Sequence, residues 1–534
     1  MKNIWTSSNF KEILPDCISI YSQSLLPELL NNATKEQYKC YGFHIGDSIM
    51  PIVKVFNRKP YFNMTALQYV IEHCWLQDGK TIARSMGGAC DTELSKNMNV
   101  DKGIVSNIKL SVRAARAILY GSKSHMEISK EWKHLEKENW SDIDRIVSHS
   151  EMHRMSILEK QISKCIQRHL IITVFASALV DVASRCVKKR ESKSKSPNAE
   201  YLLGAAADAP NIQQQNDFNE LVYFFAKKKS GVTDFELEIE TKFKHYVAKY
   251  GHRSVFEMEV AQPRLSEQPE NLLSEIEAAC AAGILGDPRR KKNKPDGLLS
   301  NSTKRPYIEK IWVFMARSLL SSREKSKYLV ARKVSQMRME LLLIARSGKI
   351  PGLVLPEDIF TLERNEINRI LDGALPDARV LISARKTYSQ PPMPDSFQGR
   401  EPNSGSTECI MKHSLGGVSV SAGKVVGRIK VLRSPVDIAK LKMGDIAAVK
   451  ALDSCWNALY LIASGVLTEV GGIMSHAAIM VREQQIPAIF NISNLFEVVE
   501  DNDEVEIDCE KGVYTILSRG IAEIVELPIC TVVQ

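Results

Sequence analysis

The sequence lacks any apolar run long enough to cross a membrane. Its longest such run, Leu170 to Val180, falls well short of the ~20 residues that a bilayer requires. The first residues also lack the apolar core of a secretory signal, because Lys11, Glu12 and Asp16 arrive early. These absences predict a soluble, cytoplasmic protein with no membrane partner.

Closely spaced cysteines are missing as well. Eleven cysteines occur singly between Cys17 and Cys530, in an odd total, so we expect neither a disulfide framework nor a bound metal. The net charge of +8 is mild for this length and owes much to two short runs, Lys188–Lys195 and Arg289–Lys294. Because no nucleic-acid-binding module accompanies these runs, the sequence predicts no nucleic-acid partner.

The composition that remains is typical of a globular protein, with 44% apolar and 25% charged residues. A chain of 534 residues is too long for one hydrophobic core, so we expect two or three domains. Apolar residues recur at helical spacing in three stretches, and one short strand is expected early in the chain. The three helical stretches and the strand are Ile104–Lys189, Asn216–Tyr250, Tyr307–Gly348 and Ile52–Phe56. Residues 1–390 are therefore predicted to form a mainly α-helical domain.

The composition changes near residue 390. Four prolines and two glycines fall between Gln390 and Ser406, which predicts a flexible linker over residues 391–411. Residues 412–534 are predicted to form a compact β/α domain, because short β-rich runs alternate there with turns or short helices. The expected strands are Lys424–Leu432, Ile446–Val449, Gly465–Val470, Glu504–Asp508 and Val513–Leu517. The predicted fold class is thus multidomain, helical first and then β/α.

One histidine of the second domain stands where a helix is expected to begin. Gly471 and Gly472 permit a tight turn after a strand, and Ser475 has the side chain of an N-cap residue. Residues 477–483 are good helix formers. His476 would then lie in the first helical turn, where unpaired backbone N–H groups and the helix dipole favour negative charge.

An imidazole in that position combines two useful properties. It is a nucleophile at neutral pH, because its ordinary pKa is about 6.5. The helix end, together with the hydroxyl groups of Thr468 and Ser475, would hold the oxygens of a phosphoryl group that the ring had accepted. The alternative is a polar surface histidine without chemistry, which is the commoner role of a single histidine near a helix start.

The sequence around His476 reads Thr468-Glu-Val-Gly-Gly-Ile-Met-Ser-His476-Ala-Ala-Ile-Met-Val-Arg482-Glu, followed by Ile486-Pro-Ala. It resembles the phosphohistidine signature of the phosphoenolpyruvate-utilising enzymes. Within that family the chain is similar to rifampin phosphotransferase and to phosphoenolpyruvate synthase-like proteins that lack an ATP-grasp domain. The resemblance implies a swivelling domain that carries phosphate on His476, with Gly471, Gly472 and Arg482 among the phosphate-binding residues. Asp453-Ser-Cys-Trp456 departs from the family's Asp-Pro-x-Trp pattern, so the contacts of this loop are not carried over.

The helical region resembles the substrate domain of rifampin phosphotransferase-like proteins at Tyr250-Gly-His-Arg-Ser-Val-Phe-Glu257 and Pro263-Arg-Leu-Ser-Glu267. In this block His252 could remove the proton of an acceptor hydroxyl, and Arg253 could stabilise charge on a transferring phosphoryl group. Substrate-binding roles are expected for Glu257, Arg264, Glu267 and Arg323. The alternative is an internal ion-pair network that only holds helices together.

The resemblance implies a phosphotransferase of the dikinase kind that works through phospho-His476. Such enzymes charge their histidine from ATP through an ATP-grasp domain, and this sequence contains no such region and no Gly-rich phosphate loop. We therefore expect a separate ATP-grasp protein of the PEP/pyruvate-binding type to bind ATP and Mg²⁺ and to phosphorylate His476. A small-molecule acceptor would occupy the helical domain. Two alternatives remain, namely a biosynthetic condensation enzyme that activates its substrate by phosphorylation, and a non-catalytic phosphate relay.

Overall fold

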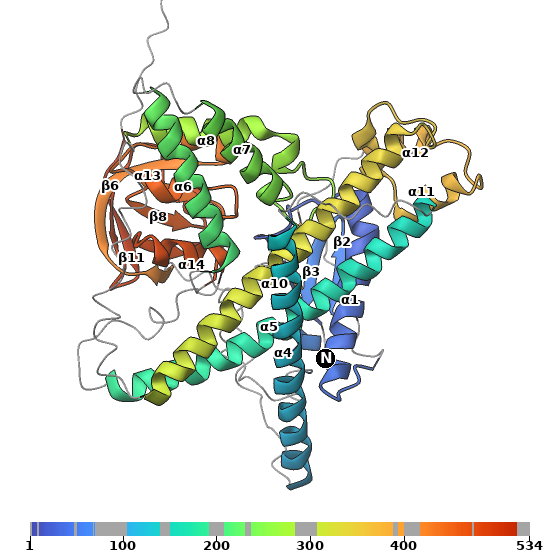
Figure 1. Ribbon diagram of the computed structural model, residues 1–534, viewed down its shortest axis with the longest axis horizontal. Coiled ribbons are helices and arrows are strands. Elements are labelled where there is room, and N and C mark those ends of the chain that lie inside the picture. The colour runs from blue at the N-terminus through green and yellow to red at the C-terminus, as the bar shows by residue number, and fades with distance from the viewer. Residues whose placement is uncertain are drawn as a thin grey trace, which may run out of the picture.

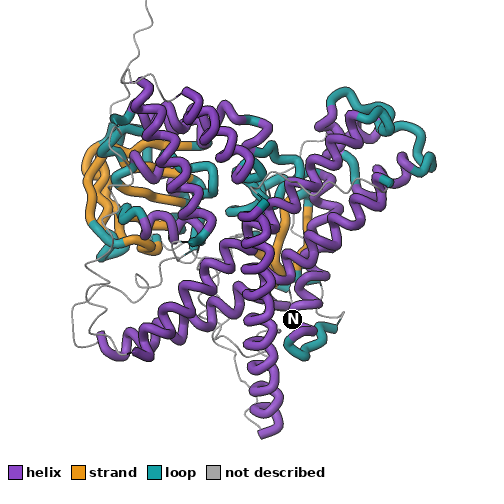
Figure 2. The backbone as a smooth tube through the Cα atoms, viewed as in Figure 1, coloured by secondary structure: helices purple, strands orange, loops and turns teal. Residues whose placement is uncertain are grey.

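The computed structural model describes residues 3–7, 10–46, 51–67, 69, 104–138, 150–191, 208–229, 236–283, 307–387, 393–399, 417–472 and 475–520. Helices dominate the larger, amino-terminal part of the chain, and a curled mixed sheet with short helices forms the carboxyl-terminal part (Figures 1 and 2). The structure is thus mainly helical with a mixed sheet in its carboxyl-terminal region, as the composition predicted.

The helical body is built on two long antiparallel helices, α5 and α10. Arg154 of α5 pairs with Glu340 of α10, and farther along His169 of α5 lies 2.8 Å from the hydroxyl of Ser326. The apolar positions of both helices fill the main core, which explains the helical periodicity of the sequence. The helices of the body are α1 (Ile20–Cys40), α4 (Ile104–Lys137), α5 (Glu151–Glu191), α6 (Pro210–Lys229), α7 (Glu236–Tyr250), α8 (Pro269–Ala281), α10 (Tyr307–Arg346), α11 (Arg364–Leu371) and α12 (Arg379–Lys386).

A four-stranded sheet lies at the amino-terminal side of this body. Its order is β2-β3-β1-β4, with β1 (Ile4–Thr6), β2 (Val53–Phe56), β3 (Lys59–Asn63) and β4 (Ser396–Gln398). Strand β4 pairs antiparallel with β1 and places Phe397 opposite Trp5. The linker prediction therefore needs correction at residues 396–398, because strand pairing and aromatic packing tie them to the amino terminus. Residues 391–392 and 400–411 of that predicted linker lie outside the described residues.

The carboxyl-terminal sheet has seven strands in the order β11-β10-β6-β7-β8-β9-β5. The strands are β5 (Val418–Ser421), β6 (Lys424–Leu432), β7 (Ile446–Val449), β8 (Gly465–Thr468), β9 (Ala488–Phe490), β10 (Glu504–Asp508) and β11 (Val513–Ser518), and the short helices are α13 (Leu459–Ile462), α14 (His476–Glu483) and α15 (Leu495–Val498). Strands β6 to β9 are parallel, and Val449 stands opposite Thr468 where β7 and β8 end. The loops that follow these two residues consequently leave the sheet at the same edge.

Helices α6, α7 and α8 lie over the carboxyl-terminal sheet rather than along the α5–α10 pair (Figure 1). Phe218, Tyr246 and Ile276 of these helices share one apolar cluster with Val449 and Trp456 of the carboxyl-terminal domain. Burial of such a cluster is the main favourable term in association, so this contact is a packed interface between the two parts.

Two features of the sequence cannot be placed. The charged run Arg289–Lys294 and residues 192–195 of the other run lie outside the described residues.

No helix in the described part of the chain is both long enough and apolar enough to span a bilayer.

Candidate functional site

Helix α14 begins at His476, and its start is capped as the sequence predicted. Ser475 is the N-cap residue, and its hydroxyl accepts the backbone N–H of Ala478 at 3.1 Å. Gly471 closes the preceding turn against Phe490, where an added Cβ would lie 2.8 Å from the aromatic ring. Only glycine fits so close an approach without a shift of the ring. The side chain of His476 is thus held at the amino-terminal end of α14.

His476 is buried, with 6% of its surface exposed, and its partner comes from the other part of the molecule. Its Nδ1 lies 3.2 Å from Oε2 of Glu324, which stands on α10 of the helical body. Glu324 is buried as well, with 4% exposed. The ring is therefore covered by the helical body and does not point into the core of its own domain.

The charges at this contact favour an ionised carboxylate and a neutral ring. Burial by itself would raise the pKa of Glu324, but the hydrogen bond with His476 and the charge of Arg323 bring the pKa far below its usual range. Burial lowers the pKa of His476, and the hydrogen bond to Glu324 only partly opposes this effect. The imidazole is consequently neutral at neutral pH, with Nδ1 donating to Glu324.

Cationic side chains of the helical body surround this pair. Arg253 forms an ion pair with Glu257, with 2.8 Å between Nε and Oε1, and Nζ of Lys327 lies 3.9 Å from Oε2 of the same carboxylate. Arg323 lies 3.7 Å from the second oxygen of Glu324. Burial would raise the pKa of Glu257, but Arg253, Lys327 and His476 together lower it. Three cations thus converge on the region that His476 faces.

Two carboxylate oxygens of this site are buried without a hydrogen-bond partner among the described residues. They are Oε1 of Glu324 and Oε2 of Glu257. Native structures leave few buried polar atoms unpaired, and an unpaired one usually marks a functional site or a missing ligand or water. The arrangement is consistent with a pocket that a ligand completes.

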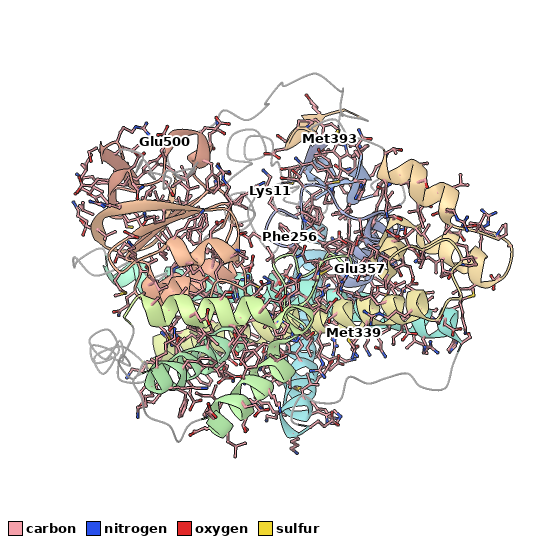
Figure 3. All side chains as sticks on the ribbon, turned by 90° about the horizontal axis from the view of Figure 1, so that it is seen from above. Lys11, Phe256, Met339, Glu357, Met393 and Glu500 are labelled. Carbon is pink, nitrogen blue, oxygen red and sulfur yellow. The ribbon has the colours of Figure 1, made fainter. Side chains whose placement is uncertain are left out.

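Glu12, at the amino-terminal edge of the helical body, also reaches the site. Its carboxylate accepts a hydrogen bond from the backbone of Gly472, four residues before His476. Burial raises the pKa of Glu12, although Lys327 and Arg323 oppose the rise. The neighbouring Lys11 is labelled in Figure 3, where it lies between the carboxyl-terminal domain and the amino-terminal sheet. Nearby, Asp16 and Lys450 form a further ion pair between the two parts, at 2.9 Å.

Two of the expected phosphate-binding side chains point elsewhere. Thr468 is fully buried within its own domain, where its hydroxyl donates to the backbone oxygen of Val470. Arg482 lies near the far end of α14, where its Nε donates to the backbone oxygen of Val420 at 2.6 Å. It stands six positions after His476, which is about 9 Å along a helix. In this structure both side chains serve the fold of the carboxyl-terminal domain, and their phosphate-binding role stays a prediction.

The Gly-His-Arg block divides between the site and the framework. Arg253 and Glu257 reach the site, whereas Arg264 is fully buried and bonds to the hydroxyl of Ser254 and to two backbone oxygens. Glu267 forms a two-pronged ion pair with Arg338 at 2.7 and 2.8 Å. Arg264 and Glu267 thus form the internal network that was the alternative for this block, and their substrate-binding role stays a prediction.

His252 is placed beside the site but in a different setting from His476. Its ring packs edge-on against Tyr328, with 4.2 Å between the ring centres, and its Nε2 is buried without a hydrogen-bond partner among the described residues. Burial and the charges of Arg253 and Arg332 hold the pKa of His252 well below its ordinary value. The ring is therefore neutral, and its role as a general base stays a prediction.

Sequence reasoning missed Glu12, Glu324, Lys327 and Ser454 as residues of this site. Glu324 and Lys327 stand one turn apart on one face of α10, beside the expected Arg323, so their spacing was the available signal. Glu12 and Ser454 had no local signal, because only the packing of distant segments brings them together. In the described part of the chain, no group of three or more metal-binding side chains is found.

Two family matches cover the two sides of this site. Residues 441–512 match the family described as the PEP-utilising enzyme mobile domain, and this match contains His476. Residues 211–324 match the family described as the rifampicin phosphotransferase fourth domain, and this match contains Arg253, Glu257 and Glu324.

Individual relatives agree with these matches. A rifampicin phosphotransferase of Bacillus cereus is 23% identical over 80% of this chain and 48% of its own length. One from Streptomyces sviceus is 26% identical over 51% of this chain and 34% of its own length. A phosphotransferase of Bacillus subtilis, YvkC, described as uncharacterised, is 33% identical over 20% of this chain and 12% of its own length.

The chain spans between about a third and a half of the length of the rifampicin phosphotransferases that it matches. The sequence motifs around His476 and around Arg253 fall inside the two matched regions. Residues 441–512 of this chain are thus similar to the mobile domain of phosphoenolpyruvate-utilising enzymes, and residues 211–324 are similar to the fourth domain of rifampicin phosphotransferase.

Proposed function

We propose that this protein is a phosphotransferase that carries a phosphoryl group on His476 and delivers it to an acceptor held by the helical body. The observation that supports this most directly is the contact between His476 and Glu324 across the two parts of the molecule, with Arg253 and Lys327 beside it. A neutral imidazole facing fixed cations is the arrangement that phosphoryl transfer requires.

In the charging step Nε2 of His476 is the nucleophile. Its lone pair forms a bond to phosphorus while the bond from phosphorus to the leaving oxygen of the donor breaks. In the transfer step the acceptor oxygen bonds to phosphorus, the N–P bond breaks, and its electron pair returns to Nε2. Glu324 keeps the ring proton on Nδ1 in this second step, so the ring leaves as a neutral imidazole.

The helical body supplies the remaining groups of the transfer step. Arg253 and Lys327 neutralise the phosphoryl oxygens as they move from nitrogen to the acceptor. The proton of an acceptor hydroxyl passes to a nearby base, for which His252 and Glu12 are the two candidates. Glu12 is linked directly to the loop of His476, through the backbone of Gly472.

The phosphoryl donor is proposed to be ATP with Mg²⁺, bound by an ATP-grasp domain on a separate polypeptide. The resemblance of the carboxyl-terminal domain to a mobile domain supports this part of the proposal. In the structure His476 is covered by the helical body, so charging requires the carboxyl-terminal domain to swing away and expose the ring. The structure would then correspond to the transfer state of the cycle.

The acceptor is proposed to be a small molecule with a hydroxyl group. The names of the relatives make rifampicin the first compound to test. A phosphorylated product would support the simple transferase. A product without phosphate but with a new C–C or C–N bond would identify a condensation enzyme instead.

The direct test combines this protein with ATP, Mg²⁺ and an ATP-grasp protein of the PEP/pyruvate-binding type, and measures the intact mass. We expect a gain of one phosphoryl group that is labile in acid and stable in alkali, and absent from His476→Ala. A gain that persists in His476→Ala would overturn the assignment of the carrier. A gain from ATP without the second protein would overturn the separate donor.

A further inference from the structure

Residues 453–458, termed here the docking loop, form a polar contact between the carboxyl-terminal domain and helices α6 and α8. Nε2 of Gln214 donates to the backbone oxygen of Ser454 at 3.0 Å, and Nε2 of Gln215 donates to that of Asn457 at 3.1 Å. From the loop, the backbone N–H of Ala458 donates to Glu275 at 3.1 Å. All of these groups are buried, which makes each bond costly to leave unmade.

The polar contacts of the docking loop surround an apolar anchor. Trp456 is 4% exposed and packs in the cluster that also holds Tyr246 and Ile276 of the helical body. Nε1 of Trp456 and Oε1 of Gln215 have no hydrogen-bond partner among the described residues. A buried aromatic side chain with polar contacts around it is typical of the residues that dominate binding energy at an interface. The loop therefore has the character of a specific binding surface rather than of an incidental contact.

The docking loop also touches the phosphoryl-transfer site. The hydroxyl of Ser454 donates to Oε1 of Glu257 at 3.0 Å. The same oxygen pairs with Nε of Arg253, and the second oxygen of Glu257 faces Nζ of Lys327. One side chain of the carboxyl-terminal domain thus holds the carboxylate that faces two of the three cations, Arg253 and Lys327.

We infer that the docking loop latches the carboxyl-terminal domain onto the helical body, and that Ser454 is a positioning residue which aligns Arg253 and Lys327 only when the domains are docked. When the domain leaves, Glu257 loses the hydroxyl of Ser454, and the two cations lose a fixed partner. Docking and the assembly of the transfer site are therefore one event. The first half of this inference stands on the interface alone, and the second half rests on the proposed function.

The latch is tested by the chemical reactivity of His476, without any partner or acceptor. Diethyl pyrocarbonate modifies an exposed neutral imidazole, so the rate at which His476 becomes carbethoxylated in the full chain measures undocking. We expect Gln214→Ala and Gln215→Ala to raise this rate several-fold, as peptide mass mapping would show. Gln213→Ala is the matched control, because Gln213 directly precedes Gln214 on α6 and its side chain donates to the backbone oxygen of Asp208, away from the docking loop.

Thermal unfolding and circular dichroism show whether each variant is folded, and Ser454→Ala supplies a second, smaller perturbation of the same loop. An unchanged rate of modification in folded Gln214→Ala, Gln215→Ala and Ser454→Ala would overturn the latch. A rise that is equal in the Gln213→Ala control would overturn it as well, because the effect would then belong to α6 in general.

The positioning role is tested by pre-charging the protein with potassium phosphoramidate and following the loss of the phosphoryl group from His476. Removing a hydrogen bond to a charged group costs about 10- to 150-fold in rate. We expect about that loss in the transfer step of Ser454→Ala, with charging by the reagent equal to wild type or faster. Ser454→Thr keeps the hydroxyl and should restore transfer, which a purely structural role would not predict.

Transfer at the wild-type rate in Ser454→Ala would overturn the positioning role. If His476 is never phosphorylated by any donor, the proposed function fails, while the carbethoxylation rates still decide the latch.

Discussion

Glu324→Gln is expected to slow phosphoryl transfer out of phospho-His476 while leaving the charging step intact. Arg323 lies 3.7 Å from Oε1 of Glu324, so the carbonyl oxygen of a glutamine would face Arg323 and its N–H would face Nδ1 of His476. An N–H donor at Nδ1 disfavours a proton on that atom. The ring could then no longer leave phosphorus as a neutral imidazole with its proton on Nδ1.

The magnitude of this effect follows from the contact. A hydrogen bond to a buried charged group contributes about 1.5–3 kcal/mol, which corresponds to about a 10- to 150-fold change in rate. Reversal of the ring tautomer adds to this, because a carboxylate-to-amide change beside a catalytic histidine is known to cost about 10⁴-fold in serine proteases. We therefore expect a loss of about 10²- to 10⁴-fold in the transfer step.

The assay uses protein charged with potassium phosphoramidate, freed of the reagent, and followed by intact mass in the presence of the acceptor or of water alone. Charging should proceed normally, because the domain is undocked when His476 accepts phosphate. Glu340→Gln is the matched control, since Glu340 stands on the same helix and pairs with Arg154 away from the site. Decay of the phosphoryl group at the wild-type rate in Glu324→Gln would refute the assignment of Glu324.

Three further predictions concern the interface, the proton acceptor and the turn before His476. Burial raises the pKa of Glu275 to about 8, and its carboxyl group contacts the docking loop. If undocking exposes this group to water, docking takes up a proton, and the docked fraction should fall as pH rises from about 4 towards 8. Small-angle scattering should record this loss. Glu275→Gln should reduce the pH dependence without abolishing it, because burial also raises the pKa of Asp453 in the docking loop, to about 7. An equal dependence in the variant would exclude Glu275 as a cause. If Glu12 is the base that takes the proton from the acceptor hydroxyl, Glu12→Gln should slow transfer at least tenfold more than His252→Asn does. A larger loss in His252→Asn would identify His252 as the base instead. Gly471→Ala places a Cβ 2.8 Å from the ring of Phe490. This clash should destabilise the carboxyl-terminal domain by about 1–3 kcal/mol, which thermal unfolding measures. An unchanged unfolding midpoint would show that the ring of Phe490 moves aside at no cost.

Much of the local structure follows from the sequence. Strands β6, β7 and β10 have the predicted boundaries, because their apolar residues lie between clear turn signals. The start of α14 was predicted from Gly471, Gly472 and Ser475, since capping and tight turns depend on neighbouring residues only. Strand β4 was missed, because a three-residue segment in a proline-rich stretch becomes a strand only through pairing with the distant β1.

The sequence by itself determined that His476 stands at a helix start and that the chain carries motifs of phosphoenolpyruvate-utilising enzymes. Only the tertiary structure decided which side chains His476 meets. Glu324 is 152 positions away and Ser454 is 197 positions from Glu257, so no local pattern connects them. In the same structure the side chains of Thr468, Arg482, Arg264 and Glu267 bond within their own parts of the molecule. A motif constrains the residues beside it along the chain, whereas the partners across an interface depend on how two separately folded parts meet.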